Sequence, residues 1–132
     1  MIITITAPCG GNKTRTALEL GATLGLINQQ KVVYLTNDKD YMDWIPHIKA
    51  IVGKDNMATF RPVYAKDLDT ALHILPCVDH LPYDIIILDG FSHEFVKLSQ
   101  KDLYFLLRSM KLYTTNKCGK IIVTLQENNS DY

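Results

Sequence analysis

Short apolar runs alternate along the chain with longer segments of mixed polarity, and this alternation predicts strands separated by helices. Runs of strand length, rich in β-branched residues, occupy residues 2–6, 32–35, 84–89 and 120–126. In the third run, four consecutive apolar residues stand between two acids, which is typical of a central strand covered on both faces. A fifth run, at 59–63, contains Arg and Pro in its middle and is therefore expected at a sheet edge or a bend.

The segments between these runs carry helix signals. Residues 13–28 place apolar side chains on more than one face, which predicts a largely buried helix. Further along, Pro46 is expected to open or kink a helix that Gly53 ends. Asp67 is a predicted N-cap for a helix over 68–75, which the following proline ends.

A last helix is predicted behind Ser99 and Asp102, which have the spacing of a capping box with Asp in place of Glu. Behind this pair, apolar residues repeat at helical spacing: Leu103, Leu106, Leu107 and Met110. Strands that alternate with helices in this way favour βαβ units. The sequence therefore predicts a three-layer α/β fold, in which a mostly parallel sheet of about five strands has helices on both faces.

Length and composition limit the number of domains and the class of protein that the sequence can encode. A chain of 132 residues, 47% of them hydrophobic, is expected to form one domain over 1–132. Fourteen basic and fourteen acidic residues give zero formal charge, which does not support direct nucleic-acid binding but leaves a local basic patch open. No apolar run approaches the ~20 residues of a membrane helix, and no basic segment precedes the short apolar start. We therefore expect a cytoplasmic protein without a membrane anchor.

The cysteines and histidines do not indicate a metal site. Three cysteines are widely spaced and form no C-x-x-C pair, so they are expected to be free thiols: Cys9, Cys77 and Cys118. Four histidines lie on separate segments without the paired spacing of metal ligands: His47, His73, His80 and His93.

The most informative stretch is APCGGNKT, residues 7–14, between the first predicted strand and the first predicted helix. It ends in the Lys-Thr pair of the phosphate-binding motif G-x-x-x-x-G-K-[ST], and its position is the one that motif requires. Ala7 and Asn12 stand where the motif has glycine. Ala7 is tolerable if its backbone is extended, and Asn12 adopts left-handed conformations more readily than most residues. The competing interpretation is an ordinary strand-to-helix turn with a chance Lys-Thr.

In a working phosphate loop, backbone N–H groups at the helix N-terminus would bind the phosphates. Lys13 would reach the β- and γ-phosphates, and the Thr14 hydroxyl would bind Mg²⁺. Asp89, which ends the run IIILD, would hold the Mg²⁺ shell opposite Thr14, unless it only caps the next turn. The predicted nucleotide-binding residues are Pro8, Cys9, Gly10, Gly11, Asn12, Lys13, Thr14 and Arg15.

With these motifs, the chain resembles the RecA-like P-loop ATPases, especially DnaB-type replicative helicases and KaiC-like ATPases. The resemblance covers about 2–128 and rests on APCGGNKTRTALELGATLG, VVYLT followed by an acid, YDIIILDG and IIVTLQENN. It implies ATP and Mg²⁺ as cofactors. It also implies that Asp38, or Asp40 in another register, polarises the attacking water, and that Gln126 senses the γ-phosphate. The competing interpretations are that Asp38 N-caps the following helix and that Gln126 is an ordinary polar residue at a strand end.

Several residues differ from the motifs of other P-loop families and make those families less similar to this chain. Gly90 follows Asp89, where helicases and AAA+ proteins carry the catalytic base, and Pro8 stands where ParA/MinD-type ATPases carry a signature lysine. Nucleotide kinases need several arginines, and this chain has only Arg15, Arg61 and Arg108. A core this small favours a protein of a phage, plasmid or similar mobile element.

The sequence thus supports ATP binding with weak Mg²⁺-dependent hydrolysis by a minimal RecA-like ATPase, which could serve a DNA-processing or mobile-element machine, and it does not separate ATP from GTP. RecA-like sites often take an arginine from a neighbouring subunit, which implies a homo-oligomer using Arg61 or Arg108, unless both are solvated surface residues. One alternative is a degenerate, non-hydrolysing P-loop module for assembly, interaction or nucleotide sensing. Another is an accessory protein of a nucleic-acid machine, with a protein partner contacted by aromatic residues that otherwise belong to the core: Tyr41, Trp44, Phe91 and Phe95.

Overall fold

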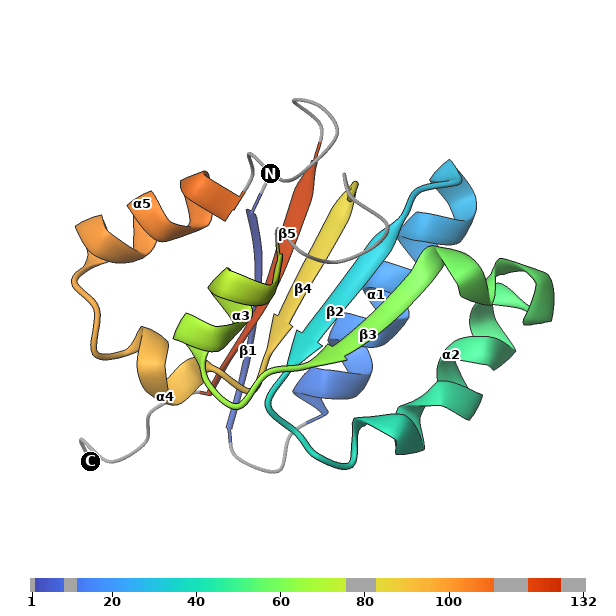
Figure 1. The fold of residues 1–132 in the computed structure, drawn as a ribbon, viewed down its shortest axis with the longest axis horizontal. Coiled ribbons are helices and arrows are strands. Elements are labelled where there is room, and N and C mark those ends of the chain that lie inside the picture. Colours follow the sequence, from blue (N-terminus) through green and yellow to red (C-terminus); the bar gives the residue numbers. More distant parts are fainter. Residues whose placement is uncertain (1, 9–11, 76–82, 111–118, 127–132) are drawn as a thin grey trace.

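The computed structural model describes residues 2–8, 12–75, 83–110 and 119–126, and its strands form one five-stranded sheet with all neighbours parallel (Figure 1). The strand order is β1-β5-β4-β2-β3. The strands are β1 (Ile2–Ala7), β2 (Val32–Thr36), β3 (Phe60–Tyr64), β4 (Ile85–Asp89) and β5 (Lys120–Gln126). The predicted α/β class with a parallel sheet of five strands is confirmed for these residues.

Helices cover both faces of the sheet (Figure 1). They are α1 (Lys13–Asn28), α2 (Ile45–Val52), α3 (Leu68–Ile74), α4 (Ser92–Phe95) and α5 (Gln100–Met110), with short 3₁₀ helices at Tyr41–Trp44 and Lys54–Thr59. One apolar core joins α1 and α2 to one face of the sheet, and a second joins α3, α4 and α5 to the other. The described residues therefore form three layers, as the sequence predicts.

The local signals account for where these elements begin and end. Strand β3 lies at the edge of the sheet, where the missing N–H of Pro62 is tolerated. Helix α2 carries Pro46 in its first turn and ends at Gly53, whose φ is 84°. Asp67 caps α3 by accepting the N–H of Thr70 at 2.7 Å. Proline 76 and the three cysteines lie outside the described residues.

Helix α5 begins after Ser99, whose Oγ accepts the Asp102 N–H at 3.1 Å. A capping box has two reciprocal bonds, and among the described contacts this is the one that forms. Buried Leu107 and Met110 face the core, so the apolar period read from the sequence is the packed side of the helix.

The aromatic residues expected either in the core or against a partner divide unequally. Phe91 and Phe95 are buried in the core beneath α3 and α5, so a partner surface formed by them is excluded. Tyr41 and Trp44 are half-buried and pack against the core beneath α1 and α2. Among the described residues, the most exposed large aromatic side chains are instead Tyr104 and Phe105 on α5.

The parallel arrangement brings the carboxyl ends of the strands to one edge of the sheet, the lower edge in Figure 1. Helix α1 begins at this edge and passes close over β4. The close packing is seen at Gly21, where an added Cβ would lie 2.5 Å from Ile87 Cδ1. In the register of the sheet Thr36 is the partner of Asp89, and Ala7 is the partner of Gln126. Residues far apart in sequence therefore meet at this edge. No helix of the described part is long and apolar enough to cross a membrane.

Candidate functional site at the carboxyl edge of the sheet

Asp89 lies at the centre of a buried cluster of hydroxyl groups. Thr14 Oγ1 on α1 donates to its Oδ2 at 2.9 Å, and Tyr34 OH on β2 donates to the same oxygen at 3.0 Å. Thr124 Oγ1 on β5 donates to Oδ1 at 2.6 Å. Only 5% of Asp89 is exposed, so these three donors replace most of the water that an acid of this kind would otherwise bind.

The period of the strands explains why these residues meet. Asp89 ends β4, which lies between β5 and β2, so both neighbouring strands can reach its side chain. Side chains on a strand alternate between faces, and Tyr34 packs in the core beneath α1. Burial, followed by the negative charge of Asp89, raises the pKa of Tyr34, so its hydroxyl stays protonated and donates.

Asp89 has no cationic partner among the described residues. The described ion pairs involve other acids, and Asp89 contacts only hydroxyl donors. Buried acids are usually compensated by a positive charge or a metal ion. Lys13 precedes Thr14 and does not take part in the ion pairs found among the described residues. Oxygen ligands from Thr14 and Asp89 fit the preference of Mg²⁺ for hard oxygen donors.

The residues that flank the loop do not adopt the left-handed backbone that favours glycine. Ala7 is the last residue of β1, so its backbone is extended and a glycine is not needed there. Asn12 has φ −81° and ψ 46°, which is outside the left-handed region. The explanation that Asn12 replaces glycine through left-handed tolerance is therefore wrong; its carbonyl instead accepts the Thr16 N–H at 2.9 Å. Pro8 is exposed, and Cys9, Gly10 and Gly11 lie outside the described residues.

Asp38 lies near the cluster but is not hydrogen-bonded to it. Its charge contributes to the raised pKa of Tyr34, which places the carboxyl group at the same edge of the sheet. The side chain is exposed and Oδ1 accepts the Asp40 N–H at 2.9 Å, while its own N–H donates to Thr36 Oγ1 at 3.1 Å. The N-cap position of the following 3₁₀ helix belongs to Asp40, so the prediction that Asp38 caps it is wrong.

Gln126 ends β5 directly beside Ala7, the first residue of the loop sequence. Its side chain is exposed, and its backbone N–H donates to Ser92 Oγ at 2.7 Å. The structure thus brings Gln126 to the start of the loop and fixes its backbone from α4. A role for its amide toward a phosphate stays a prediction.

Gly90 turns the chain immediately after Asp89. Its φ is 91°, a conformation that residues with a side chain rarely adopt, and a Cβ there would overlap the side-chain oxygen of Asn37. The backbone after Asp89 therefore requires a glycine at this position. A residue with a side chain, such as Glu, would be strained there, and its Cβ would overlap the Asn37 side chain.

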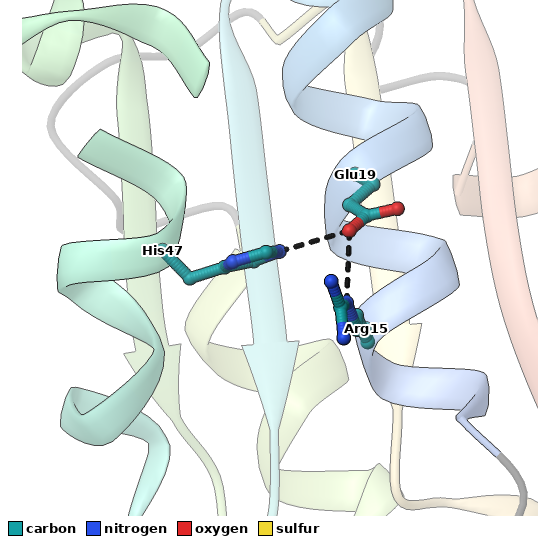
Figure 2. Close-up of polar contacts among 3 residues, drawn as sticks. All are labelled: Arg15, Glu19 and His47. Carbon is teal, nitrogen blue, oxygen red and sulfur yellow. Dashed lines mark hydrogen bonds and ion pairs between the residues drawn. The ribbon is translucent and has the colours of Figure 1, made fainter. Parts of the chain in front are cut away.

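Arg15 makes its described contact with an acid on its own helix. Arg15 Nε donates to Glu19 Oε1 at 3.0 Å, and His47 Nε2 on α2 lies 3.1 Å from the same oxygen. Figure 2 shows the Glu19 carboxylate between the two side chains, joining α1 to α2. The hydrogen bond from Arg15 is the largest cause of the lowered pKa of Glu19. Arg15 is more than half exposed, and a role of Arg15 in phosphate binding stays a prediction.

Sequence reasoning did not identify Tyr34 or Thr124 as part of the site. The available signal was their polarity inside apolar runs, since a buried hydroxyl in a strand requires a partner. The order of the strands, which brings β2 and β5 to either side of β4, was the missing information. No group of three or more His, Cys, Asp or Glu side chains able to hold a metal lies within the described ranges.

Comparisons with known proteins do not assign the chain to a family. No family model matches the sequence, and no curated protein matches it significantly. The described residues form a five-stranded parallel α/β fold, an architecture compatible with P-loop and Rossmann-like proteins.

Proposed function

We propose that this chain binds a nucleoside triphosphate with Mg²⁺ at the carboxyl edge of the sheet and hydrolyses it slowly. The observation that carries the proposal is the contact between Thr14 and Asp89, 2.9 Å apart and separated by 75 positions in sequence. These are the hydroxyl and the acid that the loop motif and the strand motif assign to one metal site. Ligands of open α/β sheets bind at this edge.

The charges at this edge support the proposal. Asp89 is a buried acid whose described neighbours are neutral hydroxyls, so a divalent cation would supply the missing positive charge. Lys13 would contact the β- and γ-phosphates, and the start of α1 favours an anion because unpaired N–H groups and the helix dipole point outward there. The cofactor would supply the phosphoanhydride bond, and these residues would orient it.

Slow turnover follows from the surroundings of Asp38. This acid is the candidate for orienting the attacking water, but it is exposed and its Oδ1 is engaged with the Asp40 N–H. A general base held by a turn and surrounded by solvent is poorly placed to activate a water. The same observation favours the second candidate function, a nucleotide-sensing or assembly module that binds without hydrolysis.

The proposal is tested by the Mg²⁺ dependence of nucleotide binding in Thr14→Val. We expect the variant to lose most of the enhancement that Mg²⁺ gives to ATP affinity, because its hydroxyl can no longer bind the ion. The matched control is Thr16→Val, an exposed threonine of the same helix turn, which should keep the enhancement. Equal Mg²⁺ dependence in wild type and Thr14→Val would contradict the proposed site. Phosphate release measured on the same samples separates hydrolysis from binding alone.

A further inference from the structure

Helix α5 has two stripes of side chains with different chemistry. One stripe faces the core and is apolar: Leu103, Leu106, Leu107 and Met110. The other consists of Lys101, Tyr104, Phe105 and Arg108, which follow the same i, i+3, i+4, i+7 spacing and so share one side of the helix. All four residues of this second stripe are exposed, so we call it the outer stripe of α5.

The aromatic rings of the outer stripe are unusually open. Tyr104 is 52% and Phe105 56% exposed, and their ring centroids lie 6.3 Å apart at an interplanar angle of 63°. The core packing of α5 uses the opposite side of the helix, so neither ring is needed there. Two large rings side by side in solvent form an apolar surface that folding of the described chain does not cover.

Each ring has a cation over it. The Lys101 ammonium lies 6.0 Å from the Phe105 centroid, and the Arg108 guanidinium lies 5.6 Å from the Tyr104 centroid. Arg108 also donates to the Tyr104 hydroxyl at 3.1 Å. The single acid of α5, Asp102, lies three positions before Phe105, about 60° from it around the helix, and so borders the stripe on the side away from Arg108. With two cations and one bordering acid, the outer stripe keeps a net positive charge beside its aromatic rings.

We propose that the outer stripe of α5 binds single-stranded nucleic acid. Exposed rings stack on unpaired bases of any sequence, and neighbouring cations neutralise the phosphates between them. Insertion into a membrane surface fits less well, because the aliphatic side of α5 is already packed against the sheet. Zero net charge over the whole chain does not oppose this surface, because the interaction depends on the local charge of the stripe.

The inference is independent of the proposed nucleotide site, and the experiment keeps the two apart. Anisotropy of a fluorescein-labelled oligothymidylate of about 15 nucleotides is measured with the full chain, without nucleotide or Mg²⁺. We expect binding by wild type and by Lys13→Ala alike. Loss of binding in Lys13→Ala would overturn the proposal by assigning the oligonucleotide to the loop, and absence of wild-type binding would overturn it outright.

Ring variants test stacking directly. Tyr104→Leu and Phe105→Leu retain apolar contact but remove the π surface, and each should weaken binding at least about fivefold. Phe105→Tyr keeps a ring and should bind like wild type. The control Met42→Ala changes an apolar side chain that is 58% exposed elsewhere and should have no effect. Wild-type affinity in both leucine variants would contradict stacking and favour an apolar protein partner instead.

The salt dependence tests the cations. Two phosphate contacts to a single strand predict a slope of log affinity against log salt of about −1.4, and Arg108→Ala should reduce it to about −0.7. The control Lys49→Ala, at an exposed position on α2, should leave the slope unchanged. An unchanged slope in Arg108→Ala, or equal affinity for a duplex of the same length, would contradict the proposed contact.

Discussion

Two carboxyl groups at helix α1 differ in burial and in the charge of their partners: Asp89 contacts the helix, and Glu19 belongs to it. Asp89 is 5% exposed and is held by the hydroxyls of Thr14, Tyr34 and Thr124. The side chain of Glu19, little more than one turn beyond Thr14, is 44% exposed and lies between Arg15 and His47 (Figure 2). One acid therefore has neutral partners in the interior, whereas the other has basic partners at the surface.

The difference separates a structural contact from a candidate site. Glu19 is already compensated by Arg15, and solvent screens what remains of its charge, so it has no need of a ligand. Asp89 loses nearly all its hydration without gaining a cation from the described residues, which is costly unless an ion or strong donors compensate it. The three hydroxyl donors compensate part of this cost, and under the proposed function a bound cation would compensate the rest.

The largest effect on stability is expected when a hydrogen-bond donor to Asp89 is removed. Thr124→Val keeps the shape of the side chain but removes the hydroxyl at 2.6 Å, and we expect it to lower the free energy of unfolding by about 1.5–3 kcal/mol. Thr4→Val, an exposed threonine on β1, is the matched control and should change stability little. Chemical denaturation measures both, and an equal effect of the two substitutions would contradict the dependence of Asp89 on its buried donors.

A second effect concerns the turn that follows Asp89. Gly90→Ala should destabilise the protein by about 1–3 kcal/mol, because the residue has φ 91° and a Cβ would overlap Asn37. Gly53→Ala is the control: φ is similar at 84°, but nothing lies within 4 Å of the added Cβ. Gly53 has ψ 157°, a region almost exclusive to glycine, so Gly53→Ala also carries backbone strain. Adding Asn37→Ala should recover stability in Gly90→Ala but not in Gly53→Ala; if thermal unfolding shows no recovery in either, the contact with Asn37 does not constrain this turn.

The smallest effect is expected at Glu19. Its folded-state pKa is lowered from 4.5, so its contribution to stability is present above pH about 4.5 and is lost as pH falls through the lowered pKa. The difference in melting temperature between wild type and Glu19→Gln should therefore be present at pH 6 and shrink progressively as the pH falls below about 4.5. High salt should reduce it. A difference that grows with acidity would show that the pairing in Figure 2 does not lower this pKa.

Much of the secondary structure follows from local sequence, whereas the site depends on strand order. The helix over residues 13–28 and the strand over 120–126 begin and end where periodicity places them, because caps and apolar periods are local. Thr14 and Asp89 were predictable as a pair from their motifs. Tyr34 and Thr124 were not, because only the order of a parallel sheet brings β2 and β5 to either side of β4.

Two further features lie beyond what local signals give. Asp38 was a candidate N-cap, but its carboxylate forms a turn instead by accepting the Asp40 N–H. An Asp side chain can accept an N–H two residues later both in a turn and at a helix start, so the sequence does not separate the two. The exposure of Tyr104 and Phe105 is likewise set by which side of α5 packs on the sheet. The apolar period identifies the inner stripe, but aromatic residues are common in cores, so their exposure became clear only from the packing.

The most direct test of the central claim is calorimetric titration of Mg·ATP into wild type and Lys13→Ala, with Lys49→Ala as the control for loss of an exposed lysine on α2. The account predicts saturable heat for wild type and Lys49→Ala, and none for Lys13→Ala, because the loop lysine carries the phosphate contact. Absence of binding in wild type, or equal binding by wild type and Lys13→Ala, would contradict a nucleotide site at the carboxyl edge of this sheet.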